Sequence, residues 1–110
     1  MDKFHVFVAD NFLTRFLGYM FRKTPHHQTI LIKPCNSIHT FFMNFDIDVL
    51  FINKEMEVIK KINSLSPRKI IFPVYLSVSV MEGKAGIFKN IAIGEKIEIQ
   101  QDFCTFRKNK

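Results

Sequence analysis

The sequence has few cysteines, glycines and prolines and no tryptophan. Two cysteines, four glycines and four prolines among 110 residues are too few for a disulfide-stapled scaffold, a collagen-like polymer or a low-complexity chain. No apolar run approaches the roughly 18 residues that a membrane-spanning helix needs. The N-terminal segment MDKFHVFVADNFLTRF carries charged side chains and no small-residue cleavage site, unlike a signal peptide. We therefore expect a cytoplasmic protein with reduced thiols and no membrane partner.

What the chain does contain is typical of one globular domain. Hydrophobic residues make up 47% of the sequence and charged residues 24%, and a length of about 100 to 150 residues is usual for a single domain. We expect this domain to span residues 1–106. Residues 107–110 form a basic tail, whose polar side chains lack the apolar neighbours that would dock them.

The chain is basic, with a net charge of +6 and a pI near 9.5. Such a charge suits an anionic partner such as nucleic acid. Lysine greatly outnumbers arginine, however, as the codon bias of an AT-rich genome would also produce. The residues that could bind a polyanion lie close together in the sequence: Lys60, Lys61, Arg68 and Lys69.

Hydrophobic periodicity predicts a mainly β fold with one or two short helices. Alternating apolar residues predict strands, and spacings of three and four predict a helix over 12–20 that Asp10 or Asn11 would cap. The expected strands span residues 4–8, 29–33, 38–43, 48–53, 57–62, 70–81 and 96–101. In the 70–81 strand, Leu76, Val78 and Val80 are expected on one face, with Ser77 and Ser79 on the other. Many short strands separated by turns favour a compact β-sandwich or a partly closed barrel.

The segment SIHTFFMNFDIDVLFIN is the most apolar part of the chain, which predicts strands buried on both faces. We expect residues 38–53 to form a hairpin that turns near 44–47. If residue 43 pairs with residue 48, His39 and Asp48 share a face, whereas a register slip of one residue separates them. A carboxylate there could orient the imidazole or hold Arg15 or Arg22.

Cys35 and His39 are a second pair that could carry chemistry. In an extended chain they stand roughly 13 Å apart, beyond the reach of a shared metal ion or hydrogen bond, unless residues 34–37 bend. A zinc site would also need His26 or His27. No phosphate-binding loop or nucleophile elbow is present, so we expect no metal and no cofactor.

Several segments in order along the chain resemble the domain-of-unknown-function 192 family, a prokaryotic group of small, mainly β domains. These segments are LTRFLGYMFR, PCNSIHTFFMNFDIDVLFIN, VMEGKAG and IAIGEKIEI. The chain departs from the family pattern at Phe42, where tryptophan is common, at Met56, where a turn glycine is usual, and at Gly83-Lys84, where Leu-Pro is common. The resemblance implies a fold but no activity. It singles out five polar residues inside family motifs as candidate binding residues: Arg15, Arg22, His39, Asp48 and Glu82.

We therefore expect a non-catalytic domain that binds a small ligand or a protein partner beside the 38–48 hairpin. In this hypothesis Arg15 or Arg22 pairs with Asp48 or Glu82. One alternative is an enzyme that uses His39 as base and Asp48 as its orienting partner. The other is nucleic-acid binding through the basic residues near 60–69. The sequence predicts neither the ligand nor the oligomeric state.

Overall fold

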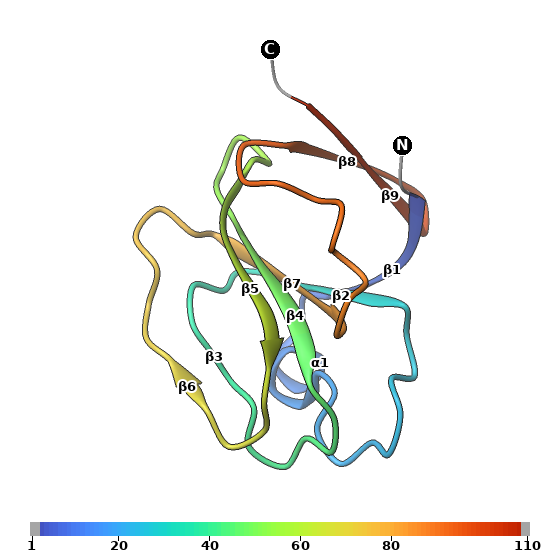
Figure 1. The fold of residues 1–110 in the computed structure, drawn as a ribbon, viewed down its shortest axis with the longest axis vertical. Helices are drawn as coiled ribbons and strands as arrows, with labels where there is room; N and C mark the ends of the chain where they lie inside the picture. The colour runs from blue at the N-terminus through green and yellow to red at the C-terminus, as the bar shows by residue number, and fades with distance from the viewer. Residues whose placement is uncertain (1–2, 109–110) are drawn as a thin grey trace.

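Seven strands form one curled sheet, and two short strands pair beside it (Figure 1). The computed structural model describes residues 3–108, apart from the side chains of Phe12 and Phe16. The elements are β1 (Lys3–Ala9), α1 (Phe12–Leu17), β2 (Thr29–Ile32), β3 (Ile38–His39), β4 (Ile47–Ile52), β5 (Val58–Leu65), β6 (Ile70–Ile71), β7 (Ser79–Lys84), β8 (Lys96–Gln100) and β9 (Phe103–Arg107). The predicted mainly β class is confirmed. In this described part, no helix is long and apolar enough to cross a membrane.

The large sheet runs in the order β5-β4-β7-β2-β1-β9-β8. Within it β1 and β2 are parallel, because the chain between them passes through α1 and returns in the same direction. The two edges meet at one end, where Glu57 forms a bridge with Lys96 and Ile97 N donates to Met56 O at 2.8 Å. The sheet is therefore partly closed, with backbone contacts between its two edges at that end.

Both faces of the sheet are packed, and β4 is buried along its whole length, as its apolar sequence predicts. One face, which we call the loop face, lies beneath residues 85–95 and includes Leu50 and Phe88 in its core. The other, which we call the helix face, lies beneath α1 and β3 and includes Tyr19 and Phe51. Because successive side chains of a strand point to opposite faces, each residue of β4 and β7 belongs to one of these two environments.

The predicted 38–53 hairpin is wrong. Only Ile38 and His39 are extended in its first half, and they pair with β6, whereas β4 pairs with β5 and β7. Thr40 explains the change, because its hydroxyl donates to Ser66 O at 2.7 Å and accepts from Lys69 N at 2.8 Å. These bonds tie residue 40 to the loop that follows β5, and the chain turns immediately afterwards, with Phe42 at a φ of 64°.

The predicted 70–81 strand is also wrong in its middle. β6 ends at Ile71 and β7 begins at Ser79, and the chain turns at Leu76, whose φ is 69°. The turn reverses the expected faces: Leu76 and Val78 are exposed, while Ser77 and Ser79 are buried. Ser77 Oγ finds acceptors in the backbone oxygens of Cys35 and Ser79, which satisfies its hydroxyl in the interior.

Strand β9 was not expected from the sequence. It pairs with both β1 and β8, and its last residue is Arg107, the first residue of the expected tail. Arg107 Nε lies 2.9 Å from Glu98 Oε1. Asn109 and Lys110, which complete the expected tail, lie outside the described residues.

Candidate functional site

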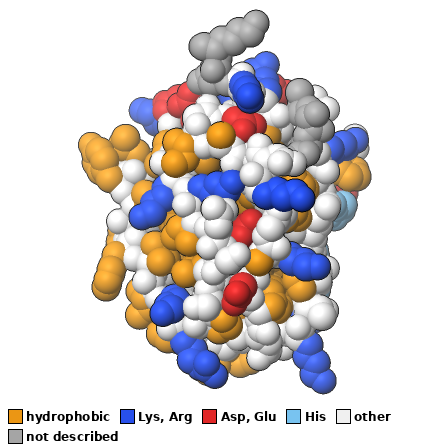
Figure 2. Space-filling model, in the orientation of Figure 1, with side chains coloured by type: hydrophobic (Ala, Val, Ile, Leu, Met, Phe, Trp, Pro, Cys, Tyr) orange, Lys and Arg blue, Asp and Glu red, His pale blue; other side chains and the backbone are white. Residues whose placement is uncertain are grey.

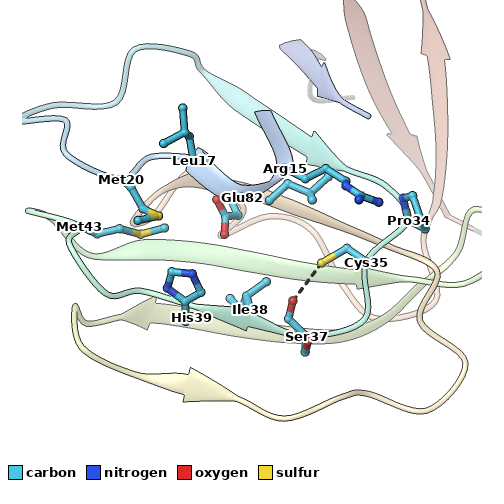
Figure 3. A pocket seen from close by; sticks show the side chains of 12 residues that line it. Arg15, Leu17, Met20, Pro34, Cys35, Ser37, Ile38, His39, Met43 and Glu82 are labelled. Carbon is cyan, nitrogen blue, oxygen red and sulfur yellow. Dashed lines mark hydrogen bonds between the residues drawn. The ribbon is translucent and has the colours of Figure 1, made fainter. Parts of the chain in front are cut away.

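A cavity of about 290 Å³ opens on the helix face of the sheet (Figure 3). It lies between the end of α1, the segment that leads into β3, and the middle of β7. Met20, Ile32, Ile38 and Met43 give it an apolar wall, and all four side chains are buried. Its ionisable and polar lining comes from Arg15, Cys35, Ser37, His39 and Glu82.

Glu82 is the most unusual residue of this lining. Its strand, β7, lies between β4 and β2, where residue 82 pairs with Val49 and Ile30. The side chain is only 2% exposed, and its Oε1 atom has no hydrogen-bond partner among the described residues. Burial raises the pKa of this carboxyl to about 8, because an apolar environment disfavours the charged form. Glu82 is therefore a largely neutral acid at pH 7.

Gly18 leaves room for the Glu82 carboxyl group. A Cβ atom built at position 18 would lie 3.2 Å from Glu82 Oε1, and the residue has a φ of 46°. Glycine adopts this conformation without the strain that a side chain would add. The same residue ends α1, donating its N–H to Thr14 O at 3.1 Å. The helix is therefore shorter than predicted.

Arg15 lies in the last turn of α1, near one side of the cavity. The helix begins at the predicted cap, where Asn11 Oδ1 accepts from Thr14 N at 2.9 Å. Figure 3 shows the Arg15 side chain reaching toward Pro34 and Cys35. Among the described residues, neither Arg15 nor Arg22 forms an ion pair within 4.0 Å with Asp48 or Glu82, so the expected arginine–carboxylate pairs are not formed.

Cys35 and His39 line the same cavity, but neither is arranged as a nucleophile and its base. Cys35 Sγ donates to Ser37 O at 3.0 Å, and burial raises the pKa of this thiol. A thiol with a raised pKa is a poor nucleophile at neutral pH. His39 Nδ1 accepts from Phe41 N at 3.2 Å, and its ring stacks on that of Phe41 with centroids 5.5 Å apart.

Asp48 lies on the opposite, loop face of the sheet. Its Oδ1 accepts from Ser64 N at 2.9 Å, and its Oδ2 accepts from Gly86 N at 2.9 Å and Phe88 N at 3.2 Å. These bonds hold the turn after β7 against the sheet. Asp48 is therefore a structural residue here, and it does not orient His39 as the enzyme alternative requires.

Arg22 is the other candidate that does not line the cavity. It is exposed and lines, with His26, an adjoining hollow of about 160 Å³ that shares Leu17, Gly18 and Met20 with the cavity. The pKa values of His26 and His27 are lowered, first by burial and then by neighbouring cationic groups that include Arg22. Of the five candidate binding residues, the structure brings together Arg15, His39 and Glu82.

The four basic residues near 60–69 do not form one patch. Lys60 and Lys61 are neighbours in β5 and point to opposite faces, and Lys61 Nζ donates to Phe88 O at 2.6 Å and Ile91 O at 2.7 Å. Arg68 and Lys69 are exposed in the loop before β6. On the face drawn in Figure 2, lysines and arginines are scattered among other side chains. The described residues also contain no group of three metal-ligating side chains.

Three residues that line the cavity were not proposed as site residues from the sequence. Gly18 had a visible signal, because a glycine inside a helical pattern needs a reason. Met20 and Met43 stood in family motifs, but a methionine is usually core filler, so neither was proposed to line a site. The position of Met43 in the cavity wall depends on the loop at residues 40–43, where its N–H donates to Thr40 O at 3.3 Å.

The protein is a small, mainly β domain whose partly closed sheet carries a small cavity on its helix face. The family model DUF192, described as "Uncharacterized ACR", matches residues 1–99, and the chain belongs to this family. A UPF0127 protein of Pyrococcus furiosus is 36% identical over 97 residues, which cover 82% of each chain. A UPF0127 protein of Pyrococcus abyssi is 37% identical over 98 residues, covering 83% of this chain and 82% of the relative.

A solved structure supports the same fold. A protein of unknown function from Novosphingobium aromaticivorans superimposes with a TM-score of 0.76 at 19% identity, covering 87% of this chain and 75% of that one. Similarity at this level of identity shows the fold and leaves the activity to be argued from the site.

Proposed function

We propose that this protein is a binding module that holds a small organic ligand in the cavity on its helix face. The single observation that carries the proposal is Glu82, a buried residue that lines the cavity and whose Oε1 atom has no hydrogen-bond partner among the described residues. A buried polar atom without a partner is costly for a fold. Such a group is expected where a ligand supplies the missing hydrogen bond.

The cavity also has the composition of a ligand site. Ligand pockets combine a mostly apolar wall with a few convergent polar groups, and here buried Met20 and Met43 face the same space as Arg15 and Glu82. The volume of about 290 Å³ suits a small molecule better than a protein segment. We therefore favour a small ligand over a protein partner.

Binding is favoured over catalysis because the expected acid–base pair is separated. Asp48 is bonded on the other face of the sheet, and the Cys35 thiol is not activated. The cytoplasm is the compartment we propose, supported by the two described cysteines, Cys35 and Cys104, which are both free thiols.

The test is a thermal-shift screen of a broad metabolite library, because a ligand that binds only the folded state raises the melting temperature. Each hit is repeated with Cys35→Phe, which places a large ring in the cavity wall, and with Asn36→Phe, which adds the same ring at an exposed neighbour. Hits that vanish with Cys35→Phe and persist with Asn36→Phe support the proposal. Silence across the library, or hits that survive both substitutions, would reject it.

A further inference from the structure

We infer that the cavity takes a small molecule with a carboxylate at one end, an apolar body, and a hydrogen-bond donor that reaches Glu82. This inference rests on the proposed function and names the chemical class of its ligand. It is based on three kinds of group that line the cavity: the guanidinium of Arg15, an apolar wall, and the unpartnered carboxyl of Glu82.

The donor is required by Glu82. Its Oε1 atom is buried and accepts no hydrogen bond from the described residues, and Gly18 leaves the approach to this atom free of a side chain. The Cys35 thiol does not meet the need, because its hydrogen bond goes to Ser37 O. A ligand that brings a hydroxyl or ammonium group to Oε1 would supply a bond that the fold itself lacks.

The carboxylate is indicated by Arg15. A guanidinium binds a carboxylate through two parallel hydrogen bonds, and Arg15 forms no ion pair with a described acidic residue. In Figure 3, Arg15 extends toward Pro34 and Cys35, while Met20 and Met43 lie on the other side of Glu82. A ligand that spans the cavity therefore meets the Arg15 cation at one side, and the Glu82 carboxyl lies between this cation and the two methionines (Figure 3).

The body of the ligand is small and apolar. The wall of Met20, Ile32, Ile38 and Met43 offers no charge to a bound molecule. The cavity volume of about 290 Å³ is close to the lower end of the roughly 300 to 1,000 Å³ that ligand pockets span. A branched aliphatic or single-ring acid suits a cavity of this size.

The experiment uses matched probes that differ only in their end groups. For one branched skeleton these are free valine, its hydroxy-acid analogue, isovalerate and isobutylamine, and for a ring skeleton the corresponding phenylalanine set. Binding is followed by titrating backbone amide resonances of the whole chain. We expect the two bifunctional members of at least one set to bind about tenfold more tightly than the carboxylate or the amine alone.

Three variants assign the end groups. Arg15→Leu should reduce the bifunctional probes to the affinity of the amine, and Glu82→Met should reduce them to the affinity of the carboxylate. Arg22→Leu removes a cation of the neighbouring hollow and should leave the affinity of every probe unchanged. If the amino acid binds more tightly than the hydroxy acid the donor is an ammonium, and the reverse order identifies a hydroxyl. Both results support the inference.

Different results would overturn the ligand class and the proposed binding function. Equal binding of the carboxylate and the bifunctional probes would overturn the role of Glu82, and full affinity in Arg15→Leu would overturn the role of Arg15. If no probe in either set perturbs the cavity, this ligand class is wrong. A library hit of other chemistry that Cys35→Phe abolishes would still support the proposed function.

Discussion

The two faces of the sheet each bury a carboxyl group, and the protein treats the two groups in opposite ways. Asp48 on the loop face and Glu82 on the helix face lie on paired strands, β4 and β7, where they are offset by one residue. Both side chains are almost fully buried, at 1% and 2% exposure. Asp48 accepts from three backbone N–H groups, whereas Glu82 Oε1 accepts from none of the described residues.

The contrast separates stability from function. Asp48 satisfies amides that would otherwise be orphaned beneath the turn after β7, so it contributes to the fold. The fold gains no comparable bond from Glu82, whose burial without a partner costs free energy. A group that weakens the fold and lines a cavity is the kind of feature that function retains.

The glycine beside each carboxyl follows the same division. At Gly83, which pairs with Asp48, an added Cβ would come within 2.6 Å of Ile87 Cγ2, so the space is filled by the packed turn. At Gly18, the nearest heavy atom to an added Cβ is the unpartnered oxygen of Glu82. Gly83 leaves room for the packed turn, and Gly18 leaves room for the buried, unpartnered oxygen of Glu82.

The largest expected effect is on Asp48. Asp48→Ala removes the acceptor of three N–H groups, of which that of Phe88 is buried, and we expect the free energy of unfolding to fall by about 3 to 5 kcal/mol. Asp48→Asn keeps one acceptor oxygen and should lose roughly half as much. Urea denaturation of both variants measures the effect. A loss below about 1 kcal/mol in Asp48→Ala would erase the distinction between the two faces.

The second prediction concerns the pH dependence that Glu82 imposes. Its pKa rises from 4.5, the ordinary value, to about 8 in the folded protein. Between these values the folded chain keeps a proton that the unfolded chain has released, so rising pH destabilises the wild type. Glu82→Gln removes this dependence, and its stability relative to wild type should grow by roughly 1 kcal/mol per pH unit from about pH 5 to pH 8.

Denaturation curves at several pH values check this difference. Arg15, Cys35 and His39 face the same cavity and are present in both proteins, so the difference between the two proteins reports on Glu82. A stability difference that does not change between pH 5 and pH 8 would mean that the Glu82 carboxyl is not held neutral by burial.

A smaller effect is expected at Lys61, whose ammonium group anchors the turn on the loop face. Lys61→Met keeps the aliphatic stem but removes the donor to Phe88 O and Ile91 O, and should cost about 1 to 3 kcal/mol. Lys60→Met is the matched control, because Lys60 is exposed, and should change stability by less than about 0.5 kcal/mol. If the two variants lose the same small amount of stability, the Lys61 ammonium group does not stabilise the fold. Lys60 and Lys61 would then both be candidates for anion binding.

The strands were predicted where local periodicity decides the structure. β1, β2 and β8 were each expected within a residue or two of their observed bounds, and the burial of β4 followed from its continuous apolar run. The end of β3 and its pairing with β6 could not be found in this way. The run from residue 38 to 43 is as apolar as a central strand, but the hydrogen bonds of Thr40 to the distant loop at 66–69 end it.

The site was predicted only as a set of residue types. Arg15, His39 and Glu82 meet in the cavity, but the sequence contains nothing that distinguishes them from Asp48 and Arg22. Whether Asp48 faces the helix or the loop depends on the pairing of β4 with β7, in which Asp48 lies opposite Gly83, a residue far away in the sequence. A one-residue change of register would exchange the environments of the two faces.

The smallest expected effect tests whether Glu82 acts electrostatically across the cavity. Burial raises the pKa of the Cys35 thiol first, and the nearby Glu82 carboxyl raises it further. Glu82 carries its charge only above about pH 8, so Glu82→Gln should increase the rate of Cys35 alkylation by iodoacetamide at pH 9 and leave it unchanged at pH 6. Mass spectrometry of digested protein follows the reaction, with fully buried Cys104 as the internal control for unfolding. The quantity compared is the Cys35 alkylation rate of Glu82→Gln divided by that of the wild type. If this ratio is the same at pH 6 and pH 9, the charge of Glu82 does not affect Cys35, and the two residues belong to separate parts of the cavity.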